Sequence, residues 1–307
     1  MLGIEKIAVH VPPGRASNLT LRETFDIDES FLTEKIGVLE RALKAPDVDT
    51  SDLALAALHK LFEEQERSRP DIDALVVVTQ NPDTNMPHVS ALLQARAELP
   101  SACAAFDISL GCSGYVYGIC VLQAFLVANG LSRGVLVTCD PYSKIIDPND
   151  KSTVLLFGDA ATATLIGPDP VLTCGPFTFG TQGDLTGALS CTNGVLHMNG
   201  REVFNFAATV VPRDIAALLD RAHLNKEDVD CFIFHQGSRY IVETLAKRIG
   251  LAKDKVRMDI LRTGNTVSSS IPLLLQKEIN NPSVRTMVLS GFGVGLSWSS
   301  CVCKKVG

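Results

Sequence analysis

The sequence predicts an α/β fold made of two similar halves related by a pseudo-twofold axis. Short apolar runs rich in valine, typical of strands buried on both faces, alternate with segments whose apolar residues recur at helical spacing. The order of these segments in the first half recurs in the second at an offset of about 150 residues, the size of one domain. Turn-forming residues at 167–170 separate the two copies. We therefore predict halves spanning residues 1–167 and 168–307.

The first half should alternate strands with helices. Pro12-Pro13 ends the first strand, and Pro70 follows the helix that begins at Asp52. In chain order we expect a strand at Ile4–Val11, helices at Asp28–Ile36 and Asp52–Glu66, a strand at Ala74–Val78, a helix at Val89–Leu99, a strand at Cys103–Ile108, a helix at Ser113–Ala128, and strand-like segments at Gly134–Thr138 and Val154–Ile166, the second of which carries a Phe157-Gly158-Asp159-Ala160 turn.

Pairs of similar segments carry the repeat into the second half. They are LVVVTQ with FIFHQ, SALLQARAEL with VETLAKRIGL, AAFDISLGCS with VRMDILRTGNT, and GVLVTCD with RTMVLSG. The third pair places Asn265 at nearly the same point of its half as Cys112. Because the two halves face each other across the axis, we expect both corners to meet at the centre, together with His235, which directly follows a strand.

Cys112 lies in a tight corner between a predicted strand and a predicted helix. Gly111, Ser113 and Gly114 leave little bulk around it, so the backbone can turn sharply and a substrate can approach the sulfur. At the first turn of a helix, the dipole should favour the reactive thiolate. A buried structural cysteine is the alternative, and this segment alone does not decide between the two.

Composition narrows the classes of function. The 307 residues are 46% hydrophobic, enough for a large core, and the net charge of -6 argues against nucleic acid as a general partner. Nine scattered cysteines suggest reduced thiols and therefore a reducing compartment such as the cytoplasm. The start lacks a signal-peptide pattern, and no segment is apolar enough to span a membrane. Cys301 and Cys303 have no second ligand pair at zinc spacing, so we expect no metal site.

Five motifs in order resemble the thiolase superfamily, and in particular β-ketoacyl-acyl carrier protein synthase III. They are DISLGCSGYVYG, LFGDAATATLIG, FHQGSRYI, TGNT and SGFGVGLSW. The resemblance covers the chain from its first strand to its last residues and implies a homodimer of five-layered αβαβα subunits. It also implies that Cys112 accepts the acyl group, that His235 and Asn265 bind the thioester carbonyl of the extender unit, and that the backbone N–H groups of Cys112 and Gly295 form the oxyanion hole.

The implied reaction suits these residue types. A cysteine takes an acyl group from an acyl-coenzyme A or acyl-carrier-protein donor, and the acyl group is then condensed with a malonyl thioester, such as malonyl-acyl carrier protein, as carbon dioxide leaves. Neutral His235 and the Asn265 amide can donate hydrogen bonds to the enolate that forms. Coenzyme A and phosphopantetheine thioesters would be substrates, and no separate cofactor is expected.

Several positions depart from the family pattern at the substrate site. Phe31 and Lys151 stand where a tryptophan and an arginine usually enclose the adenine of coenzyme A. Ser238 replaces an asparagine that orders active-site hydrogen bonds, and Val294 replaces a glycine near the acyl pocket. These changes favour a specialised fatty-acid, polysaccharide or secondary-metabolite pathway over the housekeeping one.

Two further sites follow from the resemblance. Met86 matches the residue that closes the acyl pocket of the neighbouring subunit. Lys247 and Arg248 match a basic pair that docks the acidic carrier protein, although a solvated helix face is an equal alternative for Lys247. Two other functions stay open: a Cys-dependent acyltransferase that passes the acyl group to oxygen or nitrogen without decarboxylation, and a non-catalytic subunit of a heterodimer, which the presence of Cys112, His235 and Asn265 disfavours.

Overall fold

The computed structural model describes residues 2–63 and 72–306. The strands are β1 (Gly3–His10), β2 (Gly14–Ser17), β3 (Glu40–Leu43), β4 (Ala74–Val78), β5 (Ala104–Ile108), β6 (Gly134–Cys139), β7 (Ala161–Gly167), β8 (Leu172–Thr181), β9 (Leu189–Thr192), β10 (Val195–Met198), β11 (Cys231–Phe234), β12 (Thr286–Gly293) and β13 (Ser297–Lys305). The α-helices are α1 (Arg22–Phe25), α2 (Thr50–Glu63), α3 (Val89–Arg96), α4 (Gly114–Ala128), α5 (Lys151–Val154), α6 (Gly200–Ala222), α7 (Arg239–Ile249) and α8 (Ser270–Ile279).

The two halves have the same strand order, which confirms the predicted duplication. In a continuous nine-stranded order, β11-β12-β13-β8-β1-β7-β6-β4-β5, the first half contributes the sheet β1-β7-β6-β4-β5 and the second half the sheet β8-β13-β12-β11. A parallel bridge between Phe232 and Val256 marks the place in the second half that β5 holds in the first. The two sheets meet where β1 pairs with β8 at Ile4 and Leu172, and the predicted boundary between residues 167 and 168 falls in the connection between β7 and β8.

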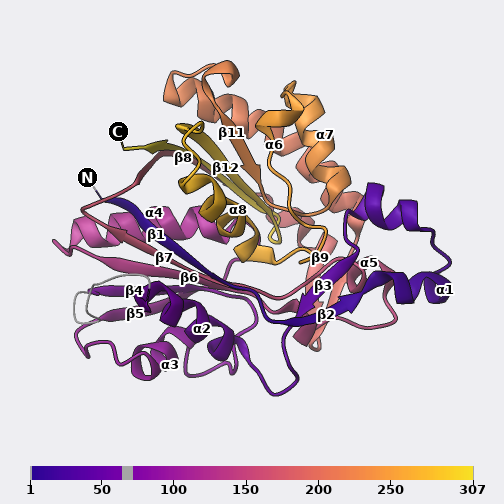
Figure 1. Cartoon of the computed structure of the whole chain (residues 1–307), viewed down its shortest axis with the longest axis horizontal. Coiled ribbons are helices and arrows are strands. Elements are labelled where there is room, and N and C mark those ends of the chain that lie inside the picture. Colours follow the sequence, from indigo (N-terminus) through magenta and orange to yellow (C-terminus); the bar gives the residue numbers. More distant parts are fainter. Residues whose placement is uncertain (1, 64–71, 307) are drawn as a thin grey trace.

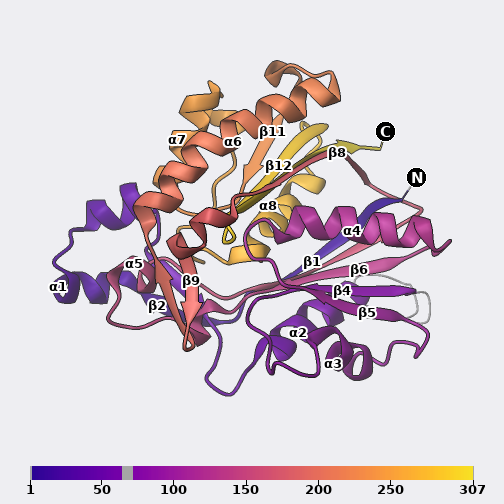
Figure 2. The same cartoon turned by 180° about the vertical axis from the view of Figure 1, so that it is seen from behind.

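Helices and sheets form five layers (Figures 1 and 2). Helices α2 and α3 cover the outer face of the first-half sheet, and α6 with α7 covers the outer face of the second-half sheet. Helices α4 and α8 lie between the sheets and contact strands of both. Tyr115 of α4 and Leu275 of α8 therefore share one buried cluster with Val76 and Leu289, which come from different sheets. Being covered on both sides, α4 is apolar all round.

In the segment Val154–Ile166 the predicted turn at Phe157-Gly158-Asp159-Ala160 is present, but the residues before it are not strand. Helix α5 ends at Val154, and β7 begins only at Ala161. The intervening turn packs against the corner that carries Asn265, because the Gly158 N–H donates to the Asn265 carbonyl at 3.0 Å. A Cβ on Gly158 would lie 1.9 Å from the carbonyl oxygen of Thr263, so this turn requires glycine.

Most other boundaries agree with the sequence within a few residues. The helix expected at Asp28–Ile36 is confirmed within one residue, because residues 29 and 30 are α-helical and Phe31–Ile36 continues them as a π-helical segment. The Asp28 carboxylate accepts the Phe31 N–H at 2.7 Å at its start. Helix α2 is described as far as Glu63, so its predicted end at Glu66 and the stop at Pro70 lie outside the described residues.

Candidate active site

Cys112 sits in the turn between β5 and α4 and is 4% exposed. Strand β12 of the other half passes directly against it: a Cβ on Gly293 would lie 2.8 Å from the sulfur, and one on Gly291 would lie 2.5 Å from the Cys112 carbonyl oxygen. The Ser113 hydroxyl pairs with the Ser297 hydroxyl at 2.7 Å. The corner is therefore built by both halves, and glycine is needed where they touch.

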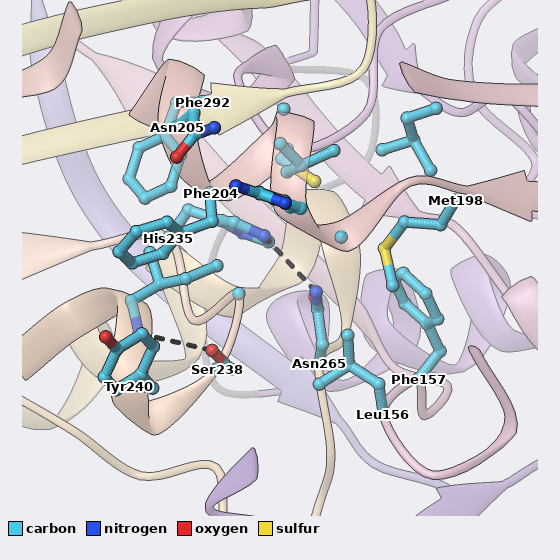
Figure 3. A pocket seen from close by; sticks show the side chains of 18 residues that line it. Leu156, Phe157, Met198, Phe204, Asn205, His235, Ser238, Tyr240, Asn265 and Phe292 are labelled. Carbon is cyan, nitrogen blue, oxygen red and sulfur yellow. Dashed lines mark hydrogen bonds between the residues drawn. The ribbon is translucent and has the colours of Figure 1, made fainter. Parts of the chain in front are cut away.

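His235 and Asn265 meet opposite each other at the same centre (Figure 3). His235 follows β11, and Asn265 precedes the 3-10 turn Val267–Ser269 that leads into α8. The Asn265 Nδ2 lies 3.4 Å from His235 Nε2. The Asn265 Oδ1 accepts the Val267 N–H at 2.9 Å, which leaves Nδ2 directed toward the histidine side of the cavity. His235 Nδ1 lies 2.8 Å from the Ser270 hydroxyl. The short segment from Val267 to Ser270 therefore orients the side chains of both Asn265 and His235.

Burial keeps both titratable groups of this centre neutral. Desolvation lowers the pKa of His235 to about 3, although a backbone hydrogen bond with Val267 acts in the opposite direction. Desolvation and then the nearby carboxylate of Asp140 raise the pKa of Cys112 to about 12, against the effect of backbone N–H groups of Cys112 and Val294. Burial therefore opposes the thiolate that the helix dipole is expected to favour.

Cys112, His235 and Asn265 line one cavity of about 500 Å³, as the repeat predicts. Its other walls are largely apolar, and Figure 3 shows Met198 and Phe157 on one side with Phe204 and Tyr240 on the other. The hairpin β9–β10 supplies Leu189 and Met198, and the first turns of α6 supply Gly200, Arg201, Val203, Phe204 and Asn205. Such a cavity can hold an apolar chain beside a small set of directed polar groups.

Comparison with known proteins agrees with this geometry. Models of the 3-oxoacyl-[acyl-carrier-protein] synthase III family match residues 106–183 and, for its C-terminal part, residues 219–305. Over 302 residues the chain is 34% identical to a beta-ketoacyl-[acyl-carrier-protein] synthase III of Geobacillus kaustophilus, with 97% of each chain covered. The chain belongs to the synthase III family. It is thus a condensing enzyme that transfers acyl groups, on the thiolase fold.

Solved structures of the synthase III family superimpose over nearly the whole chain. The beta-ketoacyl-[acyl-carrier-protein] synthase III of Thermus thermophilus gives a TM-score of 0.92 at 31% identity, covering 99% of each chain. A priming beta-ketosynthase of the R1128 polyketide pathway gives a TM-score of 0.90 at 25% identity, covering 99% of this chain and 96% of that chain.

Within residues 2–63 and 72–306, no helix is long and apolar enough to cross a membrane.

Phe31 and Lys151, expected to bind coenzyme A, do not line the main cavity. The Lys151 ammonium stands over the Phe31 ring, 5.3 Å from its centroid. A second hollow, lined by Lys35, Ile36, Ser152, Leu156, Ser238 and Tyr240, adjoins the cavity and shares its last three residues with it. Ser238 also caps α7, because its hydroxyl accepts the Ile241 N–H at 3.2 Å.

The Gly-rich segment after β12 differs from the expectation in two ways. The N–H that hydrogen-bonds the Cys112 sulfur belongs to Val294, one residue before the predicted Gly295. Among the described residues that line the cavity, Val294 is absent; its side chain points to Gly111, where a Cβ would approach it to 2.9 Å. Val294 therefore contributes its backbone to the site and its side chain to packing around the corner.

Met86, Lys247 and Arg248 all lie away from the cavity of their own chain. Met86 is 82% exposed in the loop after β4. Lys247 and Arg248 occupy the last turn of α7, whereas Ser238 at the start of that helix lines the cavity. Lys247 borders a separate groove together with Arg239 and Lys253, and Arg248 donates to the Ala208 carbonyl at 3.0 Å. Among the described residues of one chain, those that line the cavity with Cys112 do not include Met86.

The sequence analysis missed the segment that supports Asn265 and His235. Ser268, Ser269 and Ser270 are all buried, and each hydroxyl binds a different part of the site. Val267, fully buried, has a φ of 52°, which is rare for a β-branched residue. Three consecutive serines next to TGNT in an apolar region were the available signal.

Proposed function

We propose that this synthase III-family enzyme carries its acyl group on Cys112 and uses His235 and Asn265 as donors for condensation with a malonyl thioester. The observation that supports this most is the convergence of one sulfur and two neutral nitrogen donors on a single buried, otherwise apolar cavity. Acyl-coenzyme A or an acyl carrier protein would provide the first acyl group. Malonyl-acyl carrier protein would provide the extender unit, and no metal or prosthetic group would be required.

In the first step the Cys112 sulfur attacks the donor thioester. A new C–S bond forms, the donor's C–S bond breaks, and the proton of the neutral thiol ends on the departing thiol. The oxyanion of the tetrahedral intermediate would be held by the backbone N–H groups of Cys112 and Val294, both of which face the sulfur. We therefore assign the second oxyanion donor to Val294 instead of Gly295.

In the second step the malonyl group loses carbon dioxide and the electron pair moves into an enolate. The Ser270 hydroxyl accepts the Gln236 N–H at 3.4 Å, so it can donate its own hydrogen bond to His235 Nδ1. Nδ1 is then the acceptor of the neutral imidazole, and Nε2 carries the proton and acts as an N–H donor. Asn265 presents its Nδ2 at the same point, since its Oδ1 is occupied. The enolate carbon then attacks the acyl-Cys112 carbonyl, and the released thiolate takes up a proton.

The proposed pathway is a specialised one in the cytoplasm. Lys151 and Phe31 contact each other by a cation–π interaction and still offer a ring and a charge to an adenine, but without the bidentate reach of arginine. Ser238 uses its hydroxyl as a helix cap, so its oxygen is engaged where the family has an amide. Nine cysteines, one of them proposed as reactive, suit a reducing compartment.

We also propose a homodimer formed through the β5 edge of the first-half sheet. Strand β5 ends the sheet, and its residues are half-buried although four of the five are apolar. Phe125 of α4 packs on Phe106 beside this edge, with ring centroids 5.4 Å apart, and Val121 of the same helix is 38% exposed. Pairing of two such edges would remove this apolar surface from water and bring the Met86 loop toward the partner's cavity.

The test measures both steps on the same protein. Incubation with acetyl-coenzyme A should add one acetyl mass to the wild-type enzyme and none to Cys112→Ala, with the adduct mapped to the peptide that contains Cys112. Addition of malonyl-acyl carrier protein should then release carbon dioxide and a 3-oxoacyl product. An adduct on a different cysteine would overturn the role of Cys112, and acylation without any carbon dioxide from malonyl thioesters would favour the acyltransferase.

A further inference from the structure

A fully buried carboxylate, that of Asp140, has no part in the reaction as described above. Asp140 follows β6 directly and is 0% exposed. Its Oδ1 accepts the backbone N–H of Gln80 at 2.6 Å, and its Oδ2 accepts the Ser268 hydroxyl at 2.5 Å. The Ser268 backbone and the Thr79 side chain donate to it as well. A fully buried carboxylate is unfavourable unless such donors surround it, so its retention needs a reason.

The donors to Asp140 come from both halves of the protein. Gln80 and Thr79 follow β4 of the first half, whereas Ser268 lies in the second half, three residues after Asn265. Ser268 is also the residue after Val267, whose left-handed backbone directs its N–H to Asn265 Oδ1. An unusual backbone conformation of this kind persists only where surrounding contacts hold it. Asp140 supplies one of these contacts across the boundary between the halves.

The charge of Asp140 also acts on the nucleophile. Gln80, whose N–H binds Asp140, places its side-chain oxygen beside Gly111, the neighbour of Cys112, where a Cβ would approach it to 2.6 Å. The Asp140 carboxylate raises the pKa of Cys112, and also those of Cys139 and Tyr142. His235 faces Cys112 from the other side of the cavity and is neutral, so it does not offset this negative charge. In a region of low dielectric, a carboxylate beside a sulfur opposes formation of the thiolate.

We propose that Asp140 is a positioning residue with two effects: its hydrogen bond to Ser268 holds the Asn265–Ser270 segment in working shape, and its charge disfavours the free Cys112 thiolate. The first effect rests on the proposed function of Asn265, while the second concerns Cys112 alone. Removing Asp140 therefore changes the two steps of the reaction in opposite directions. Loss of the charge makes Cys112 more reactive, and loss of the anchor makes condensation slower.

The test replaces Asp140 by its uncharged isostere. In Asp140→Asn we expect iodoacetamide to alkylate Cys112 about tenfold faster than in the wild type between pH 7 and 9, where Asp140 is charged in the wild type. Malonyl decarboxylation by the acetylated variant should fall about ten- to hundredfold, the scale of one lost hydrogen bond to a charged group. Peptide mass mapping separates Cys112 from the other eight cysteines.

Asp214→Asn is the matched control, because Asp214 is also a buried carboxylate and accepts a serine hydroxyl, that of Ser300, at 2.5 Å. It should change neither rate.

Ser268→Ala should slow decarboxylation without speeding alkylation, and Ser268→Thr should restore part of the loss. The proposal is overturned if Asp140→Asn leaves the alkylation rate unchanged, or if it slows alkylation and decarboxylation alike, as a merely structural defect would. Failure of decarboxylation in the wild type would count against the proposed function, while the alkylation result would still judge the charge effect.

Discussion

Cys112 and Asn265 stand at corresponding corners of two halves that share one strand order, each just before a helix that packs between the sheets. The residues of the opposite half that touch Cys112 are glycines, Gly291 and Gly293, and a Cβ at either position would collide with it. Around Asn265 the chain carries polar groups, and Ser268 and Ser270 each bind a different partner. The Cys112 corner leaves space beside the sulfur, whereas the Asn265 corner orients hydrogen-bond donors.

The difference follows from what each corner has to do. A nucleophile must be reached by a substrate and must form a covalent bond, so small neighbours and a sharp turn are sufficient. An amide that stabilises an enolate must point its N–H at one place, so its other end has to be occupied, as Val267 occupies Asn265 Oδ1. Duplication supplied two equal positions, and different neighbours gave them different chemistry.

The largest expected effect comes from removing the directed donor. Asn265→Ala should leave self-acylation of Cys112 largely intact and reduce decarboxylation of malonyl thioesters about a hundredfold or more, the scale of one lost oxyanion donor. Release of labelled carbon dioxide and intact mass measure the two rates. Asn281→Ala, which changes an asparagine at the end of α8, is the control and should affect neither. Equal losses in both rates would mean that the two corners do not divide the work.

A smaller effect is expected from filling the room beside the sulfur. The Cβ of Gly293→Ala would lie 2.8 Å from both Cβ and Sγ of Cys112, so the corner must shift. We expect acylation to slow about ten- to hundredfold and the free energy of unfolding to fall by about 1–3 kcal/mol. Gly187→Ala is the control, because a Cβ there meets nothing within 4 Å. Unchanged acylation would show that the corner adapts easily.

Met86 extends the comparison, since its loop follows β4 as His235 follows β11. If Met86 closes the partner's acyl pocket, Met86→Trp should shift preference toward shorter acyl groups, by about 1–3 kcal/mol between acetyl and octanoyl donors. Leu19→Trp, at another exposed apolar position, should leave the order unchanged. An unchanged rank order in Met86→Trp would falsify the pocket role, and a fully active monomer would remove its basis.

The sequence was sufficient to predict the elements and the three central residues because both depend on local patterns. Valine-rich β4 and all-apolar α4 are buried on both faces, and that environment leaves a clear composition. The repeat then predicted that Cys112, His235 and Asn265 meet, and they line one cavity. The motif resemblance and the repeat agree here, although they are independent observations.

Contacts between distant segments were beyond the reach of local patterns. The turn at Gly158 was predicted, but its packing against Thr263, far along the chain, could not be predicted from the local pattern. The thiolate expectation considered only the dipole of α4, which is a local property, whereas the burial that opposes a thiolate arises where β12 of the opposite half packs on Cys112. For the same reason the link between Asp140 and Ser268 appears only when the halves are placed together.

The smallest expected effect is an absence of titration at His235. Burial lowers the pKa of this imidazole to about 3, so it should stay neutral from pH 8 down to pH 5 and remain a donor through one N–H. In the unfolded chain the same group binds a proton below about pH 6.5. Stability from this group is therefore present above pH 6.5 and is lost as the pH falls toward 3.

NMR of ring-labelled histidine should show a signal, removed by His235→Gln, that does not shift between pH 5 and 8, while the urea-unfolded chain titrates near 6.5. His235→Gln should also lose less stability than the wild type between pH 6.5 and 4. An inflection near pH 6 in the folded protein would mean that the centre is hydrated, and that burial does not set the charge of its donors.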